Sequence, residues 1–287
     1  MVSDKTKGIL CILSAAFCFA LMNLFIKLSG DIPTLQKAFF RNVVAVLVSF
    51  ILLRREHISL NCAKGNWSTV IGRAIWGTVG IFCNFYAIDH LNISDASMLN
   101  KLSPFFAILF SYIILKERAK PYQLACVGVA LAGTCFILKP SGAGLISMPA
   151  LIGMISGIAA GLAYTLLRKA TEKGVPKAFI IFFFSSFSCL ASIPYCIINY
   201  TPMSAVQLVF LLLTGLAATG GQFSITAAYS FAPARELSVY DYTQVIFAGI
   251  LGFCFLAEIP DYLSILGYFT IIAAAVFMFI KGNRQPA

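Results

Sequence analysis

Charged residues are scarce in this sequence. Only 11% of its 287 residues are Asp, Glu, Lys or Arg, whereas 60% are hydrophobic. A soluble domain has about 25% charged residues, so the composition excludes an ordinary soluble protein. Long apolar runs recur along the whole chain, and each is long enough to cross a hydrocarbon core of about 30 Å. The sequence therefore predicts an all-α polytopic membrane protein, in which every spanning segment is helical.

Residues for metal or acid–base chemistry are also few. Histidine occurs twice, as His57 and His90, and the nine cysteines form no C-x-x-C pair. We therefore expect no metal site, no disulfide framework and no cofactor. A membrane-embedded enzyme would need a water-accessible set of carboxylates, a Ser/His pair or metal ligands, and the sequence offers none. A channel or scaffold would show rings of like charge or large soluble domains, and neither is visible.

The net charge of +10 has two readings. Basic residues can bind nucleic acid, but 15 of the 21 Lys and Arg residues here fall on one set of loops and span ends. The opposite loops hold little beyond Lys37 and Lys139. Cytoplasmic loops are enriched in Lys and Arg, so we interpret the charge as a topology signal. We expect no nucleic-acid partner and place both termini in the cytoplasm.

The apolar runs predict ten transmembrane helices, five in each half of the chain. Gly, Ser and Pro are frequent in residues 139–149, which link the halves. The first repeat is therefore predicted at 1–140 and the second at 141–287. The spans lie near 8–28, 34–53, 68–88, 95–115, 121–138, 149–169, 178–198, 205–230, 237–257 and 262–281.

The two halves are similar to each other at a fixed offset of 141 residues. Residues 95–140 and 236–281 align without gaps, and Phe106, Leu115 and Glu117 meet identical residues. Five is an odd number of spans, so the second copy must enter the membrane upside down relative to the first. Two homologous five-helix units of opposite topology form the inverted repeat that many transporters use.

Several stretches carry a family resemblance. They are NLFIK (23–27), FFR (39–41), SDASMLNKLSPFFAILFSYIILKE (94–117), GVALAG (128–133), YTLLRK (164–169) and VYDYTQVIFAGILGFCFLAE (239–258). In these the sequence resembles the drug/metabolite transporter superfamily, in its ten-span branch of two EamA-type repeats. The resemblance implies an alternating-access transporter with a central cavity between the halves. It also implies amino acids, other small metabolites, nucleotide sugars or drugs as substrates.

One departure from repeat symmetry concerns a helix kink. Val245 in the second repeat stands where the first repeat has Pro104. We therefore expect a proline kink in the fourth span alone. Gly220 and Gly221 predict a break in the eighth span, and the glycines at 153, 157 and 161 predict close helix contact in the sixth.

Basic residues inside the spans are candidates for substrate binding, because a charge within a bilayer is costly. Arg41 and Lys101 lie about seven residues inside their spans, roughly 10 Å deep at 1.5 Å per residue. The alternative for both is a structural partner, either a helix-end carbonyl or a carboxylate. Lys27 and Arg73 lie nearer to span ends, where snorkelling to the interface is expected.

Asp241 is the one acidic residue deep inside a predicted span, which makes it the candidate for proton coupling. It aligns with Asn100, next to Lys101. Inversion of the repeats places Lys101 in the outer half of the membrane and Asp241 in the inner half. A cavity with a cation towards one end and a carboxylate towards the other would suit a zwitterion. The alternative is that Asp241 pairs with Lys101 or a tyrosine and holds helices together.

Uncharged residues within the spans complete the predicted substrate site. Asn23 and Tyr164 occupy equivalent positions in the first span of each half. We therefore expect both on the cavity wall. The remaining predicted members of the site are Trp76, Asn84, Asn100, Gln222 and Gln244.

The sequence thus predicts a transporter, an exporter or exchanger, of small organic metabolites in the cytoplasmic membrane of a bacterium, and not an enzyme. An amino acid or a similar amphoteric solute suits the mixed charges. The alternative is a carrier of drugs or of nucleotide- or nucleobase-type metabolites. Substrate and lipid bilayer are the expected partners. The two halves supply both sides of a cavity, so a monomer is sufficient, and a dimer stays open.

Overall fold

The structure is a computed structural model, and it describes residues 4–59, 65–116, 120–138, 147–231 and 238–284. Its described residues are almost entirely helical, as predicted. The first half contains α1 (Asp4–Leu28), α2 (Thr34–Arg55), α3 (Trp67–His90), α4 (Ile93–Asn100), α5 (Ser103–Phe110), the π-helix η1 (Ser111–Leu115) and α6 (Pro121–Leu138). The second half contains α7 (Met148–Glu172), α8 (Lys177–Ile198), α9 (Ala205–Phe231), the 3₁₀ helix η2 (Ser238–Tyr242), α11 (Thr243–Leu256) and α12 (Tyr262–Arg284).

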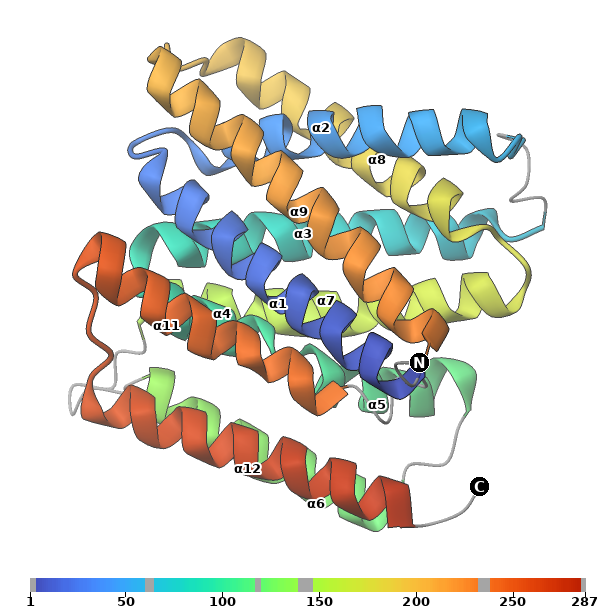
Figure 1. The fold of residues 1–287 in the computed structure, drawn as a ribbon, viewed down its shortest axis with the longest axis vertical. Helices are drawn as coiled ribbons and strands as arrows, with labels where there is room; N and C mark the ends of the chain where they lie inside the picture. Colours follow the sequence, from blue (N-terminus) through green and yellow to red (C-terminus); the bar gives the residue numbers. More distant parts are fainter. Residues whose placement is uncertain (1–3, 60–64, 117–119, 139–146, 232–237, 285–287) are drawn as a thin grey trace.

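Nine helical segments of the described chain are long and apolar enough to cross a membrane. One of them, Ile93–Leu115, joins α4, α5 and η1. A shorter apolar segment, Tyr240–Leu256, stands where the ninth span, 237–257, is predicted. The two ends of the described chain lie on the same side of the bundle (Figure 1). This arrangement confirms the predicted all-helical, multi-span fold.

Equivalent helices of the two halves pack against each other in opposite directions. Along the α2–α8 pair, Gln36 bonds to Thr201 and Asn42 to Ser188, whereas Phe50 faces Phe182. Numbers rise along one helix as they fall along the other, so the pair is antiparallel. The α6–α12 pair is also antiparallel, since Gly133 approaches Ile271 and Ile137 approaches Gly267. The two halves therefore run in opposite directions, as the inverted repeat requires.

The contacts between the two halves are symmetric, because each contact recurs between the equivalent helices of the opposite halves. Helix α1 packs on α9, and the equivalent helices α7 and α3 pack on each other. In the same way α1 contacts α11, while α7 contacts α4 and α5. Figure 1 shows α1 and α9 crossing the middle of the bundle, with α6 and α12 at one edge and α2 and α8 at the other. The molecule thus has an approximate twofold axis between its halves.

The glycines of the sixth span make the close helix contacts that the sequence predicts. A Cβ at Gly157 would lie 2.5 Å from the Leu99 carbonyl oxygen, and one at Gly161 would lie 2.7 Å from the Phe106 Cβ. Such distances leave no room for a side chain. Helix α7 is therefore seated directly on the backbone of α4 and α5.

Two expectations about helix breaks are wrong. Helix α9 runs unbroken through Gly220 and Gly221, because Gly221 serves contact with the Phe19 ring, 2.8 Å from its would-be Cβ. The break near Pro104 is not confined to the first half. Helix α5 begins at Ser103 and α11 at Thr243, which are nearly equivalent positions, although the second half has Val245 in place of proline.

Candidate functional site

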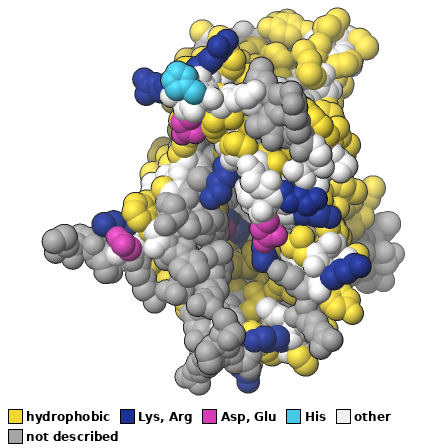
Figure 2. Space-filling view, turned by 90° about the vertical axis from the view of Figure 1, so that its right-hand side faces the viewer, with side chains coloured by type: hydrophobic (Ala, Val, Ile, Leu, Met, Phe, Trp, Pro, Cys, Tyr) yellow, Lys and Arg dark blue, Asp and Glu magenta, His cyan; other side chains and the backbone are white. Residues whose placement is uncertain are grey.

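A cavity of about 850 Å³ lies between the two halves. Its walls come from α1, α2, α3, α4, α5, η1, α6, α7, α8, α9, η2 and α11, so neither half encloses it alone. Its mouth is polar and includes Lys120, Gln123, Arg168, Thr171 and Lys177. Figure 2 views the molecule from the side on which both chain ends lie, and this face is hollowed near its centre, with Lys and Arg side chains around the hollow.

The opposite end of the bundle is closed by polar contacts between the halves. Lys27 Nζ lies 2.8 Å from Glu258 Oε1 and also donates to the Leu91 carbonyl. The other carboxylate oxygen of Glu258 accepts from the Ile93 N–H at 2.7 Å. Glu258, just after α11, therefore bonds to the end of α1 and to the start of α4. The cavity is open at one end and shut at the other.

Lys101 and Asp241 form an ion pair at the helix breaks. The Lys101 Nζ is 2.5 Å from Asp241 Oδ2, and both side chains are largely buried. The Tyr242 hydroxyl donates to the Lys101 carbonyl at 3.1 Å. Lys101 and Tyr242 are equivalent residues at the offset of 141. Contact between equivalent residues of an inverted repeat places them on the twofold axis, near the middle of the membrane.

This geometry corrects the predicted depth of the two charges. Lys101 and Asp241 were expected in opposite halves of the membrane, but they are in direct contact. The reason is that both spans break at mid-depth, so the break points of the two repeats meet. The observed contact agrees with the alternative prediction, in which Asp241 pairs with Lys101 and holds helices together. The second oxygen of Asp241, Oδ1, is buried and has no hydrogen-bond partner in the described protein. Asp241 is one of the residues that line the cavity.

Arg41 is held by amide and hydroxyl groups of its neighbours. Its Nη1 donates to Asn42 Oδ1 at 2.6 Å, and Asn42 Nδ2 donates to Ser188 Oγ on α8 at 2.8 Å. Arg41 is only 5% exposed. Its guanidinium is therefore fixed in place, and no carboxylate among the described residues neutralises it.

Arg73 is also buried, at 7% exposure, and does not reach the membrane interface. The expectation of snorkelling is wrong, because Gly77 on the next turn of α3 leaves room for the side chain to fold against its own helix. A Cβ at Gly77 would lie 2.0 Å from Arg73 Nη1. The guanidinium carbon then sits 4.4 Å from the centre of the Phe184 ring on α8, in a cation–π contact.

The predicted site is mostly brought together. Trp76 is 40% exposed and absent from the cavity walls, so it faces outward. Asn23 donates to Ser97 Oγ at 2.9 Å in the α1–α4 contact, also away from the cavity, because α1 turns this face to its neighbour. Only Tyr164 of that equivalent pair lies on the wall. The predicted residues that line the cavity are Arg41, Asn84, Asn100, Lys101, Tyr164, Gln222, Asp241 and Gln244.

Sequence reasoning missed Arg73 and Phe184 as cavity residues. Arg73 falls about two turns inside α3, a depth close to that of Arg41 in α2. The equal depth and the glycine four residues later were available signals. Phe184 carried no signal, since it is one of 26 phenylalanines in an apolar chain.

The cavity can bind a charged organic solute. Its deep groups are three cations, one carboxylate and several amides and hydroxyls, with aromatic rings from Phe19, Phe85 and Tyr164. Within the described chain no cluster of His, Cys, Asp or Glu could hold a metal ion. The chemistry offered is recognition and not bond breaking.

Comparison with known proteins gives a family match over both halves. The model of the EamA-like transporter family matches residues 6–139 and again residues 147–280. The pseudopaline exporter CntI of Pseudomonas aeruginosa is 30% identical over 279 residues, which cover 96% of this chain and 97% of that protein. A riboflavin transporter of Rhizobium johnstonii is 23% identical over 291 residues, covering 99% and 96%.

A solved crystal structure shares the fold. It superposes with a TM-score of 0.67 at 15% identity and covers 98% of this chain and 99% of the other. At this identity the likeness concerns the arrangement of helices alone.

Proposed function

Because the chain belongs to the EamA-like transporter family, within the drug/metabolite transporter superfamily, we propose that it moves amphoteric organic metabolites across the membrane by alternating access. The chain is a multi-pass membrane transporter of small molecules and not an enzyme. The observation that carries the proposal is the cavity between the halves, which combines Arg41, Arg73 and Lys101 with Asp241. Groups of both signs favour a solute that carries both signs.

The relatives support export or exchange of a metabolite. One relative is named for export of pseudopaline and another for transport of riboflavin. The aromatic wall residues Phe19, Phe85, Tyr164 and Phe184 suit a planar ring, which makes a flavin- or nucleobase-type solute the second candidate.

We place the protein in the cytoplasmic membrane of a bacterium with both termini inside. Lys and Arg residues gather on the face that carries the chain ends, consistent with the positive-inside rule (Figure 2). In this orientation the cavity opens to the cytoplasm, and the Lys27–Glu258 end faces outward. Residues 1–140 and 141–287 act as the two repeats, a division that the two family matches support. A monomer contains the whole cavity and is sufficient.

Counterflow in proteoliposomes tests the proposal. Liposomes preloaded with an unlabelled solute are given the labelled solute outside, and saturable uptake above the equilibrium level identifies a carrier. The panel includes acidic, neutral and basic amino acids and riboflavin. We expect saturable exchange of at least one amphoteric acid. Exchange of riboflavin alone would favour the second candidate, and no exchange by correctly folded protein would overturn the carrier proposal.

A further inference from the structure

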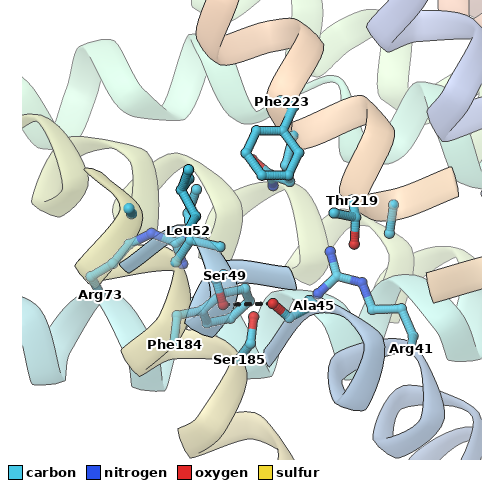
Figure 3. Close-up of a pocket in the computed structure, with 13 residues that line it drawn as sticks. Arg41, Ala45, Ser49, Leu52, Arg73, Phe184, Ser185, Thr219 and Phe223 are labelled. Carbon is cyan, nitrogen blue, oxygen red and sulfur yellow. Dashed lines mark hydrogen bonds between the residues drawn. The ribbon is translucent and has the colours of Figure 1, made fainter. Parts of the chain in front are cut away.

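Two buried arginines share one small pocket on the wall of the cavity. A space of about 30 Å³ exceeds the roughly 10–15 Å³ that one water molecule needs. Arg41 and Arg73 line it together with Ser49, Phe184, Ser185 and Thr219. Figure 3 shows the two guanidinium groups entering from opposite sides and pointing toward the space between them. Both arginines also line the large cavity, so the pocket is a side chamber of the substrate path.

Four polar atoms of the residues around this pocket have no hydrogen-bond partner within the described protein. The Nε of Arg41, and both Nε and Nη1 of Arg73, have no hydrogen-bond partner. The Ser185 hydroxyl beside them also has none. A guanidinium offers five donors in a planar fork, and buried donors without acceptors are rare in folded proteins. The arrangement is one of donors aimed into an enclosed space.

The charges around the pocket are not balanced by the described protein. The two guanidinium groups carry like charges and line the same small pocket, and neither forms an ion pair with a described carboxylate. Lys101 and Asp241 neutralise one another, which leaves Arg41 and Arg73 as the excess. An unpaired charge out of water is strongly unfavourable, and two adjacent like charges are more so.

We propose that Arg41, Arg73 and Ser185 form an anion subsite that binds the acidic group of the transported solute, and that the solute carries two net negative charges. The charge arithmetic is three deep cations, Arg41, Arg73 and Lys101, minus one deep carboxylate, Asp241, which gives +2. The chemistry recognised is an oxygen anion, either carboxylate or phosphate, in a planar fork. This inference rests on the proposed function and narrows its substrate class to acidic solutes.

Helix α8 positions both arginines. Phe184 lies against the Arg73 guanidinium, and Ser188 holds Asn42, which in turn holds Arg41. Asn42 and Ser188 are therefore positioning residues, while the guanidinium groups and the Ser185 hydroxyl would touch the anion. Because the partners are preset, the anion would bind without a large rearrangement of side chains.

Thermal unfolding of the purified full chain in detergent, in a chloride-free buffer, tests the subsite. The probes are glutarate, its neutral analogue glutaramide, and inorganic phosphate. We expect the unfolding midpoint to rise with glutarate or phosphate and not with glutaramide. Arg41→Gln and Arg73→Gln should each weaken the response to the anion by about tenfold or more, since a charge-assisted contact is lost. Arg55→Gln changes an exposed arginine on α2, the helix of Arg41, and should leave the response to the anion unchanged.

The unliganded protein provides an independent readout. If the arginines await an anion, removing one of two repelling buried charges should raise the unfolding midpoint of the empty protein. A lower midpoint in both glutamine variants would show that the arginines have a structural role and would overturn the inference. Equal responses of the wild-type protein to glutarate and glutaramide would also overturn it. A response to glutarate, to phosphate or to both supports it and identifies the anion.

Counterflow separates this inference from the proposed function. Exchange of neutral or cationic solutes alone would keep the carrier and discard the anion subsite. Anion binding that needs both arginines, without exchange of any solute, would keep the subsite and discard the carrier. Exchange of acidic solutes that is lost in Arg73→Gln supports both.

Discussion

At the scale of single residues, Gly77 determines where Arg73 can lie. The glycine has no side chain, and the Arg73 guanidinium occupies the space that a Cβ would fill. The same missing Cβ admits the Phe184 ring, whose nearest atom would be 2.7 Å away. Gly77 thus lets the Arg73 guanidinium lie at the cavity wall. Without this space the arginine side chain would extend along its helix.

Gly77→Ala should displace Arg73 and weaken transport of acidic solutes. The added methyl group collides with the flexible end of the arginine, so the side chain moves before the helix does. We expect a fall of about tenfold in the apparent affinity for an anionic solute, and a change in stability within about 1–3 kcal/mol, the usual cost of overpacking. Saturation curves for counterflow and the unfolding midpoint measure these two effects.

Gly128→Ala is the matched control, because a Cβ there meets nothing within 4 Å. It should leave transport unchanged and gain up to about 1 kcal/mol from helix propensity. Equal transport by both alanine variants would show that the space at Gly77 for the Arg73 side chain does not affect transport.

Asp241 is the candidate that the sequence offers for proton coupling. In that role, Asp241→Asn should remove the dependence of transport on pH. An amide cannot take up or release a proton in this range. The variant also leaves Lys101 without its partner, and breaking a largely buried pair costs about 3–5 kcal/mol. Transport must therefore be normalised to folded protein, in proteoliposomes at several pH values. Asp31→Asn, in an exposed loop, is the control. An unchanged pH profile in Asp241→Asn would leave this residue with the structural role alone.

At the scale of helices, the ion pair between Lys27 and Glu258 closes one end of the cavity. It joins the last turn of α1 to the residue two positions after α11. The exchange variant Lys27→Glu with Glu258→Lys should retain closure, whereas either single variant should loosen it, since like charges then meet. The readout is labelling of Ile81→Cys, on the cavity wall, by an impermeant maleimide added outside cells in a cysteine-free background.

The expected order of labelling follows from the pairing. Single variants should label several times faster than the parent, and the exchange variant should return toward the parent rate. Asp4→Asn removes the exposed pair with Lys7 and should have no effect on labelling. Equal labelling of all variants would mean that the closed end is held by the other contacts, such as Lys37 with Asp89.

Which helices the sequence could predict depended on their hydropathy. Nine predicted spans correspond to long apolar helices within a few residues, because length and composition suffice. The breaks at Lys101 and Tyr242 were harder to predict. Pro104 indicates the first break, but the second has no proline and depends on contact with its equivalent in the other half. Likewise the burial of Arg73 depends on α8, which is distant in sequence.

At the scale of the whole molecule, the twofold relation places both chain ends on one side (Figure 1). We expect both termini in the cytoplasm. A reporter that is active only in the cytoplasm should work at either end, and one active only outside should fail at both. A reporter active outside at either terminus would contradict the proposed orientation. The bias of Lys and Arg in the loops was readable from the sequence, whereas the side on which the cavity opens was not.

The distribution of charge between the halves has an electrical consequence. Arg41, Arg73 and Lys101 all come from the first half, and Asp241 comes from the second. If the halves tilt against each other during the proposed alternating access, charges of opposite sign are displaced in opposite directions. A membrane potential acts on each charge with about 2.3 kcal/mol per 100 mV for a full crossing. On the proposed mechanism we therefore expect the empty carrier to sense voltage through its arginines, and a solute that neutralises them to remove that sensitivity from the loaded step.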